Sequence, residues 1–310
     1  MKRLLYLFII PALVLMCAGN DIELQLPLRA GAIHRESMHY AKGPRVGLVL
    51  SGGGARGMSH IGVIKALEEL GVEIGLVTGT SSGAIIGALY AAGYSPSEIE
   101  AIIKEQDWEF LFSSAGDRQE TFATQKMDNE GYVIRFRMDG MKIVLPKGYT
   151  AGSNIDRLLY DYLSPANFTS GGSFDRLAIP FRTVATDLAT GNPVIFDSGD
   201  LPFAVKCASA IPLFFAPIYM DDMYLVDGGL TYPIPTEIAD SLGCDVIICV
   251  DVTAPRQKPM EEIDAPWVVL TQTTAIMAEE TKIREKSLAD ICIRPEGGER
   301  GLLDFDGMRS

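Results

Sequence analysis

The chain has 310 residues and a formal net charge of −13, with 47% hydrophobic and 22% charged residues. This composition supports a sizeable hydrophobic core and excludes an intrinsically disordered protein. The acidic balance, with no basic run after Arg3, excludes a nucleic-acid partner. The same negative charge means that electrostatic attraction cannot bring the protein to an anionic membrane.

The first residues are typical of an export signal. A short basic region precedes a 13-residue apolar run from Leu4 to Met16, which is too short to span a bilayer comfortably. We therefore expect residues 1–19 to be a signal peptide and the protein to be exported, to the periplasm, to the outer membrane or into the medium. Cys17 follows the run as in a bacterial lipobox, but Met16 stands where a small residue is expected, so lipidation of Cys17 stays open. Residues 20–42 are expected to form a linker.

Two strand–turn–helix units open the predicted catalytic domain, residues 43–300. Each combines a short apolar strand with a helix that ends near a glycine. The predicted strands and helices are Val46–Leu50 followed by 58–70, and 76–78 followed by 84–92. Short helices between apolar strands are typical of crossovers in a parallel sheet, so the pattern favours an α/β domain.

The second half of the chain continues the alternation after an insertion at residues 113–152. Alternating apolar residues around Asp139-Gly140 predict a β-hairpin over 132–145. Further predicted elements are a helix capped by Ser153 or Asn154, strands at 181–185, 245–250 and 291–293, and one long helix at 267–288. Residues 301–310 form a tail, and we keep open that the chain is a truncated part of a longer protein.

The remaining cysteines do not have the spacing of a metal site, and no histidine lies near them in the sequence. They are Cys207, Cys244, Cys249 and Cys292. On one strand, Cys244 and Cys249 would face opposite sides of the sheet, which excludes a disulfide between them. We expect these four residues to be buried free thiols, and we expect no metal ion.

A serine lies in the pattern G-x-S-x-G, formed by Gly79, Ser81 and Gly83. This pattern indicates a sharp strand-to-helix turn that exposes a nucleophilic hydroxyl at the start of a helix, where developing negative charge is stabilised. In a serine triad of that kind the histidine comes later in the chain. All three histidines, at positions 34, 39 and 60, precede Ser81. Either Ser81 is not a nucleophile, or a different base activates it.

A glycine-rich loop, Gly52-Gly53-Gly54-Ala55-Arg56-Gly57, follows the first strand. Successive backbone N–H groups in such a loop bind an oxyanion or a phosphate. Arg56 can hold the loop by bonding to carbonyls or can face anionic head groups. The loop also fits the dinucleotide-binding pattern G-x-G-x-x-G, with Glu73 as the acidic residue, although Glu73 precedes the second strand. A P-loop is excluded because Met58-Ser59 replaces the required lysine and hydroxyl residue.

Two aspartates at strand ends are candidates for the missing base. Asp227 follows the apolar residues 224–226 and precedes Gly228 and Gly229, so it can point at a site on the same sheet edge as Ser81. Asp187, which follows the strand at 181–185, is the second candidate, and we interpret it as structural.

These three motifs together resemble the patatin-like phospholipase family, whose pattern is G-G-G-x-[RK]-G, G-x-S-x-G and D-G-[AG]. The segment 199–212 is also similar to that family, and the resemblance covers residues 43–295. It implies a three-layer α/β/α fold with a mainly parallel central sheet. It also implies a Ser–Asp dyad, with Ser81 as nucleophile and Asp227 as base, and oxyanion donors at Gly53 and Gly54. Such a dyad needs no histidine, no cofactor and no metal.

The implied function is hydrolysis of phospholipids or other lipid esters, with a membrane surface as partner. Two alternatives stay open: a dinucleotide-binding enzyme of Rossmann type, and a catalytically inactive module that docks a lipid or a partner. Head-group and acyl-chain preference, A1 or A2 position and oligomeric state do not follow from the sequence.

Overall fold

The structure is a computed structural model that describes residues 43–111, 137–139, 142–144, 150, 152–255 and 266–295. The chain separates into two units, Met1–Gly31 and Ala32–Ser310, and every described residue belongs to the second. The predicted signal peptide, Cys17, the linker at 20–42 and the tail at 301–310 therefore lie outside the described residues.

A mixed eight-stranded sheet forms the centre of the domain, in the order β10-β9-β1-β2-β5-β8-β7, with β6 also paired to β5. Its strands are β1 (Val46–Leu50), β2 (Ile74–Gly79), β5 (Phe181–Asp187), β6 (Pro193–Phe196), β7 (Ile218–Met220), β8 (Met223–Asp227), β9 (Val246–Val250) and β10 (Ile291–Ile293). The strands from β10 to β5 are parallel, whereas β6 and β8 are antiparallel to β5. The predicted parallel centre is confirmed.

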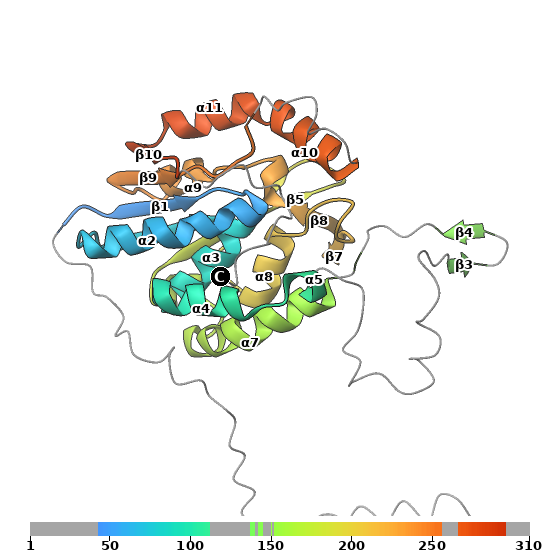
Figure 1. Cartoon of the computed structure of the whole chain (residues 1–310), viewed down its shortest axis with the longest axis horizontal. Coiled ribbons are helices and arrows are strands. Elements are labelled where there is room, and N and C mark those ends of the chain that lie inside the picture. Colours follow the sequence, from blue (N-terminus) through green and yellow to red (C-terminus); the bar gives the residue numbers. More distant parts are fainter. Residues whose placement is uncertain are drawn as a thin grey trace, which may run out of the picture. The chain divides into compact units, whose positions relative to one another are not determined.

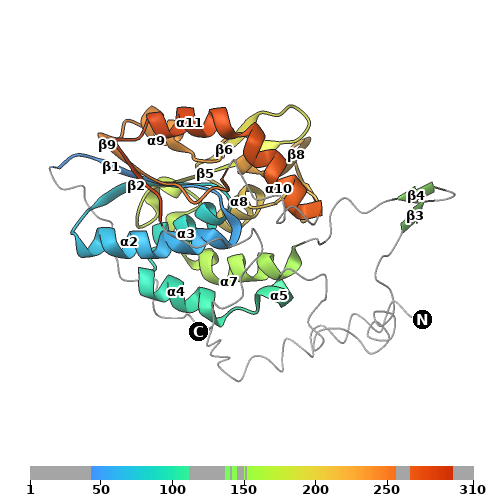
Figure 2. The same cartoon turned by 45° about the horizontal axis from the view of Figure 1, so that its top comes forward.

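Helices cover both faces of this sheet (Figures 1 and 2). They are α2 (Ser59–Glu69), α3 (Ser82–Ala91), α4 (Pro96–Glu105), α5 (Trp108–Leu111), α7 (Ser153–Ser170), α8 (Leu201–Ala208), α9 (Thr236–Ser241), α10 (Pro266–Met277) and α11 (Glu279–Ser287). Short 3-10 turns occur at Gly54–Met58, Phe174–Arg176 and Gly228–Leu230. Figure 2 shows α2, α3, α4 and α7 on one side of the sheet and α9 and α11 on the other.

The strand β1 shows how the three layers are held together. Leu48 and Leu50 belong to the larger buried cluster, which includes residues of α2 and α3, whereas Val49 packs with Ala239 of α9. Successive side chains of a strand point to opposite faces, so an uninterrupted apolar strand supplies both cores. This explains why the sequence of β1 has no polar alternation, and it confirms the three-layer α/β/α arrangement.

Several local predictions need correction. The helix predicted at 267–288 is two helices, α10 and α11, which are separated by a turn at Ala278. The helix α7 begins at Ser153 as predicted, but its preceding residue is Gly152 in a left-handed conformation and no side chain caps it. Of the four cysteines expected to be buried, Cys207 and Cys249 are buried, Cys244 is half-buried, and Cys292, on the edge strand β10, is exposed. The sulfur of Cys292 lies 3.5 Å from that of Cys249.

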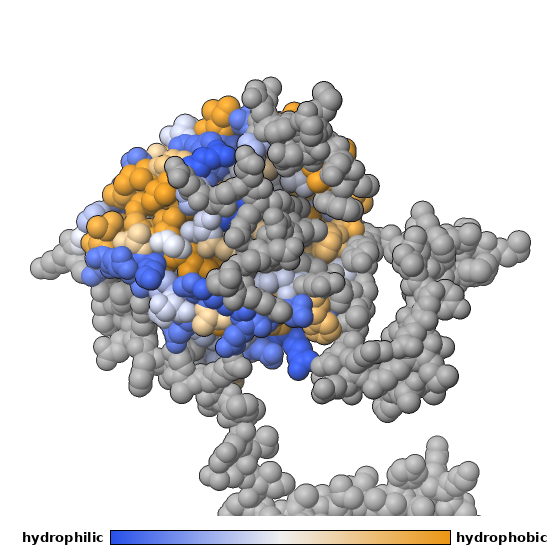
Figure 3. Space-filling view, viewed as in Figure 1, coloured by the Kyte–Doolittle hydropathy of each residue, from blue (hydrophilic) through white to orange (hydrophobic). Residues whose placement is uncertain are grey.

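Within the described part of the insertion, Arg137–Asp139 and Lys142–Val144 pair as antiparallel strands β3 and β4, as the predicted hairpin requires. None of the described helices combines the length and apolar character needed to cross a membrane. Apolar side chains reach the surface near β9 and β10 (orange in Figure 3), and Ile291 of β10 is about half exposed.

Candidate active site

Ser81 lies at the turn between β2 and α3, in the conformation of a nucleophile elbow. Its backbone angles (φ 55°, ψ −124°) are in a region that residues other than glycine rarely adopt. The turn is tight: a Cβ at Gly79 would collide with the carbonyl of Gly83, and one at Gly83 would collide with the carbonyl of Leu50. Both glycines of the motif are therefore required by the close approach of backbone to backbone.

The carboxylate of Asp227 accepts a hydrogen bond from the amide of Gly229, at 2.7 Å. The hydroxyl of Ser81 lies beside the same carboxylate, and both donors lower the pKa of this carboxyl. Asp227 is only 6% exposed, and burial outweighs these donors and raises the pKa to about 6. The carboxylate is thus a stronger base than an ordinary aspartate and is still mostly ionised at neutral pH.

Ser81 and Asp227 lie close together because β2 and β8 both pair with β5. Thr183 of β5 pairs with Gly79 of β2, and two residues later Ala185 pairs with Asp227 of β8. Because Thr183 and Ala185 also pair with β6 on the opposite side, β2 and β8 occupy the same edge of β5, one after the other. β8 runs antiparallel to β5, so the carboxyl ends of β2 and β8 face each other.

The end of α8 fixes both residues of this pair. The amide of Ser81 donates to the carbonyl of Ala208, at 3.1 Å, and the amide of Asp227 donates to the carbonyl of Ala210, at 2.8 Å. A single short segment therefore sets the distance between the strand that ends at the serine and the strand that ends at the aspartate. A glycine at 228 is needed here too, because a Cβ would collide with the carbonyl of Val184.

The glycine-rich loop borders the same site through Gly52 and Gly53. Gly54 has a left-handed conformation (φ 58°), and a Cβ at Gly53 would lie 2.5 Å from the carbonyl oxygen of Val252. Within the described residues, the amides of Gly53 and Gly54 donate no hydrogen bond, whereas that of Gly52 donates to Pro233. Buried amides without acceptors are rare, and such a pair suits an oxyanion. A Cβ at Gly57, the last glycine of the motif, would collide with the hydroxyl of Ser82.

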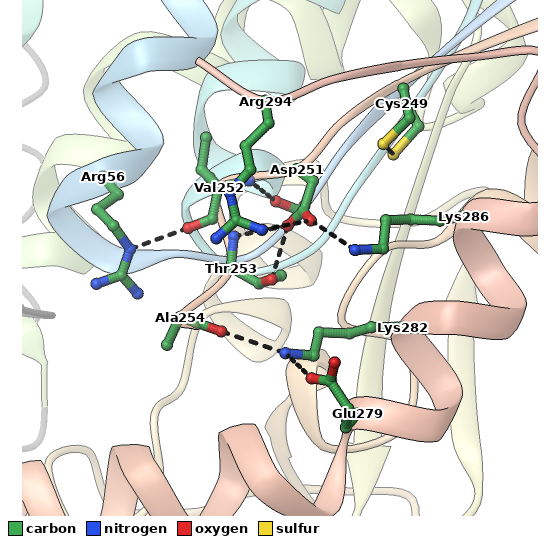
Figure 4. Close-up of polar contacts among 12 residues, drawn as sticks. Arg56, Cys249, Asp251, Val252, Thr253, Ala254, Glu279, Lys282, Lys286 and Arg294 are labelled. Carbon is green, nitrogen blue, oxygen red and sulfur yellow. Dashed lines mark hydrogen bonds and ion pairs between the residues drawn. The ribbon is translucent and has the colours of Figure 1, made fainter. Parts of the chain in front are cut away.

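The segment after β9 supports this loop from behind (Figure 4). The Arg56 Nε donates to the carbonyl of Val252, at 3.0 Å, and the amide of Val252 donates to the hydroxyl of Ser51, at 2.8 Å. The neighbouring Asp251 is buried, accepts from Thr253 and pairs with two cations, Lys286 and Arg294. Of the two roles predicted for Arg56, bonding to a carbonyl is observed.

Other sequence candidates lie elsewhere. Asp187 accepts from the amides of Ala189 and Tyr224 and from the Thr190 hydroxyl, which is the structural role expected of it. His60 is buried, its Nε2 donates to the carbonyl of Ser51, and burial lowers its pKa to about 4, so it is neutral. Glu73 is exposed just before β2, at the opposite end of that strand from Ser81.

Ser81 and Asp227 line a cavity of about 320 Å³. Its walls are mostly apolar and come from the glycine-rich loop, the residues after β5, β8 and β9, and α10 and α11. The described lining residues are Gly52, Gly53, Arg56, Ser81, Leu188, Ile211, Pro212, Asp227, Gly229, Leu230, Pro233, Thr253, Ala254, Thr271, Thr274, Ala275, Ala278 and Lys282. In the described part of the chain, no group of three or more histidines, cysteines or acids is arranged to hold a metal ion.

The wall formed by α10 and α11 was not predicted from the sequence. The residues that face the cavity from α10 and from the turn after it recur at helical spacing (271, 274, 275 and 278), but the same spacing is expected of any packed helix. Lys282 is one of several charged residues in its stretch of sequence, so nothing there distinguishes it.

Comparisons with known proteins agree on one family. The family model of the patatin-like phospholipases matches residues 48–240, which is more than half of the chain. An uncharacterized NTE-family protein of Mycobacterium tuberculosis is 30% identical over 229 residues, covering 73% of this chain and 55% of that protein. Lysophospholipase nte1 of Aspergillus fumigatus is 32% identical over 223 residues, covering 72% of this chain and 13% of that protein.

Among solved structures, VipD from Legionella pneumophila aligns with 79% of this chain and 55% of its own, at 17% identity and a TM-score of 0.39. Human GIVD cytosolic phospholipase A2 aligns with 77% of this chain and 43% of its own, at 15% identity and a TM-score of 0.36. The chain spans about half the length of the first curated relatives that it matches. From the family model and the NTE-family relatives, we conclude that the chain belongs to the patatin-like phospholipase family.

Proposed function

We propose that the chain is a serine acyl hydrolase that acts on phospholipids or lysophospholipids through a Ser81–Asp227 dyad. The observation that carries the proposal is that Ser81 and the buried Asp227 line one mostly apolar cavity together with the glycine-rich loop, whose Gly53 and Gly54 amides have no acceptor in the described residues. The family and the lysophospholipase among its relatives support a lipid ester as substrate.

Acyl transfer begins when the Ser81 oxygen attacks the ester carbonyl and its proton passes to Asp227. A carboxylate is a weak base toward a hydroxyl, and the raised pKa of Asp227 reduces this mismatch. The tetrahedral intermediate then collapses, and the leaving alcohol takes the proton from Asp227. In the second half, Asp227 removes a proton from water, the resulting hydroxide attacks the acyl-serine ester, and the proton returns to the Ser81 oxygen as the fatty acid leaves.

The amides of Gly53 and Gly54 are the proposed donors to the carbonyl oxygen as it becomes negative. They are held in place by the backbone and need no reorganisation during the reaction. Each such donor contributes about 3–4 kcal/mol of transition-state stabilisation. The start of α3, directly after Ser81, adds a favourable dipole for the same charge.

A membrane surface is the proposed source of substrate. The helix α10 has no charged residue, lines the cavity with one side and exposes Val269, Ile276 and Met277 on another. An apolar, uncharged surface next to the cavity suits contact with lipid that does not depend on charge attraction.

Export through the signal-like run at the N-terminus is also proposed. Mass spectrometry of the N-terminus after cell fractionation tests the export and the lipidation of Cys17 together.

Three serine and aspartate variants test the dyad. Ser81→Ala should abolish both labelling by a fluorophosphonate probe and release of fatty acid from a mixed lipid extract, and Asp227→Asn should abolish the release. Ser82→Ala is the matched control, because the neighbouring hydroxyl is equally buried and has no hydrogen-bond partner in the described residues. Turnover that survives in both dyad variants would refute the mechanism.

The same assay separates the alternatives. A docking module without catalysis predicts no release of fatty acid from any lipid by the unaltered chain. A dinucleotide-binding enzyme predicts calorimetric binding of NAD or FAD that is lost when Gly54 is replaced. The position of Glu73, at the amino end of β2 rather than the carboxyl end, disfavours that second alternative.

A further inference from the structure

Lys282 is a buried cation in the wall of the catalytic cavity. It lies on α11, is only 4% exposed, and lines the same cavity as Ser81 and Asp227. Lysine is almost never buried to this extent unless it is paired. Its burial in the cavity wall therefore cannot be explained by the usual role of lysine in keeping a protein surface soluble.

Among the described residues, Lys282 makes two contacts through its ammonium group (Figure 4). Its Nζ donates to the carbonyl of Ala254, at 3.2 Å, and pairs with Glu279, at 2.8 Å. An ammonium group carries three N–H bonds. In the described part of the chain, one of the three is thus without an acceptor, and Glu279 does not line the cavity although Lys282 does.

The described walls of the cavity hold little charge besides Lys282. Apart from Asp227, Arg56 and Lys282, the described lining residues are uncharged. Arg56, on the glycine-rich loop, donates its Nε hydrogen to the carbonyl of Val252 in the segment after β9. A cavity that received only an acyl chain would gain nothing from a second cation, because burying a charge costs free energy.

We propose that Lys282 binds the phosphate of a glycerophospholipid in the cavity and so selects phospholipids over uncharged glycerides. This proposal rests on the hydrolase proposed above and names a specificity-determining residue for it. A phosphodiester carries a permanent negative charge, and an ammonium group binds it as a point charge. The attraction is stronger inside a mostly apolar cavity than in water, because the surroundings screen it less.

Two pairs of ligands, in each of which only one member carries a phosphate, test the proposal. The first pair is a lysophosphatidylcholine and the monoacylglycerol with the same acyl chain, compared by kcat/KM. The second pair, an alkylphosphocholine and the alkyl glycerol ether of equal chain length, cannot be hydrolysed as esters. Their binding is measured by calorimetry below the concentration at which they form micelles, so it does not depend on turnover.

Lys282→Met should lower kcat/KM for the lysophospholipid about tenfold or more, since a hydrogen bond to a charged group is lost, and should leave the monoacylglycerol nearly unchanged. Lys282→Arg should keep the preference for the phosphate-bearing ligand. Glu279→Gln is the matched control: it breaks the same ion pair but keeps the ammonium group, so the preference should persist.

An equal loss on both substrates in Lys282→Met would overturn the proposal, because Lys282 would then serve only to hold the wall at Ala254. Equal affinity of the unaltered protein for the alkylphosphocholine and the glycerol ether would overturn it as well. A clear preference for the alkylphosphocholine without any ester turnover would instead refute the hydrolase and leave the phosphate site standing.

Discussion

Replacing Asp227 by Asn should stabilise the fold above neutral pH while abolishing turnover. The buried carboxyl has a pKa of about 6 in the folded protein, against 3.8 for an ordinary aspartate. At 1.36 kcal/mol for each pH unit, this difference corresponds to about 3 kcal/mol. An amide in the same place can still accept from Gly229 and pair with Ser81, but it carries no charge to be desolvated.

The sign of the pH dependence follows from the raised pKa. Below about pH 4 the carboxyl is protonated in the folded and unfolded chains alike, so it costs no stability. As the pH rises through about 6, the unfolded chain has already lost this proton and the folded chain must ionise a buried group. The unaltered protein therefore loses about 3 kcal/mol across this range relative to Asp227→Asn.

Urea unfolding of both proteins at a series of pH values measures this difference directly, with each free energy of unfolding obtained by linear extrapolation. Other titrating groups contribute equally to both proteins and cancel in the subtraction, provided they do not contact residue 227. Ser81→Ala is an additional control, because loss of the hydroxyl donor should raise the pKa of Asp227 further and enlarge the pH-dependent loss. A stability difference that stays flat with pH would refute the account of a desolvated base.

The other predictions use the same cavity and its support. Turnover should fall as the pH drops below about 6, because a protonated base cannot accept the proton of Ser81; a pH–rate profile shows this, and an unchanged rate at pH 5 would contradict the dyad. Gly53→Ala should lower kcat about 100-fold or more, because the added Cβ would lie 2.5 Å from the Val252 oxygen. Gly62→Ala, at an exposed position of α2 where an added Cβ has no atom within 4 Å, should leave kcat unchanged in the same assay. Asp251→Asn should lower the free energy of unfolding in urea by about 1–2 kcal/mol, because Lys286 and Arg294 lose their ion pairs behind the glycine-rich loop. The same variant should lower kcat more than it raises KM, and an equal change in kcat and in 1/KM would argue against a positioning role.

The tight turn at Ser81 was predictable from the sequence, because the close contact between Gly79 and Gly83 arises within five consecutive residues. The glycine-rich loop was recognisable in the same way, although the approach of Val252 to Gly53 joins distant segments and was not predicted. Requirements of this kind restrict residue type at fixed spacing, so the motifs can be recognised without knowledge of the fold. The apolar strand β1 is similar, since burial on both faces removes the polar alternation along five consecutive residues.

The direction of β8 was not predictable in this way. A short apolar strand has the same side-chain pattern whether it runs parallel or antiparallel to its neighbour, and the connection from β7 to β8 determines the direction. Asp227 was expected near Ser81 on the assumption that both strands end at the same edge of a parallel sheet. The two residues do meet, but they do so because β2 and β8 lie end to end along β5.

The cavity wall was harder to predict from the sequence than the Ser81–Asp227 pair. Lys282 belongs to the sequence Glu279-Glu280-Thr281-Lys282, where charges of both signs are dense and the helix has no clear apolar face. Which of these charges turns inward depends on the break at Ala278, which reorients α11 relative to α10, and on the carbonyl of Ala254 some thirty residues earlier in the chain. A nucleophile and its base can be identified from local patterns because their backbone must take particular conformations. A residue that selects the substrate needs only to reach the cavity, and that property is decided by packing between distant segments.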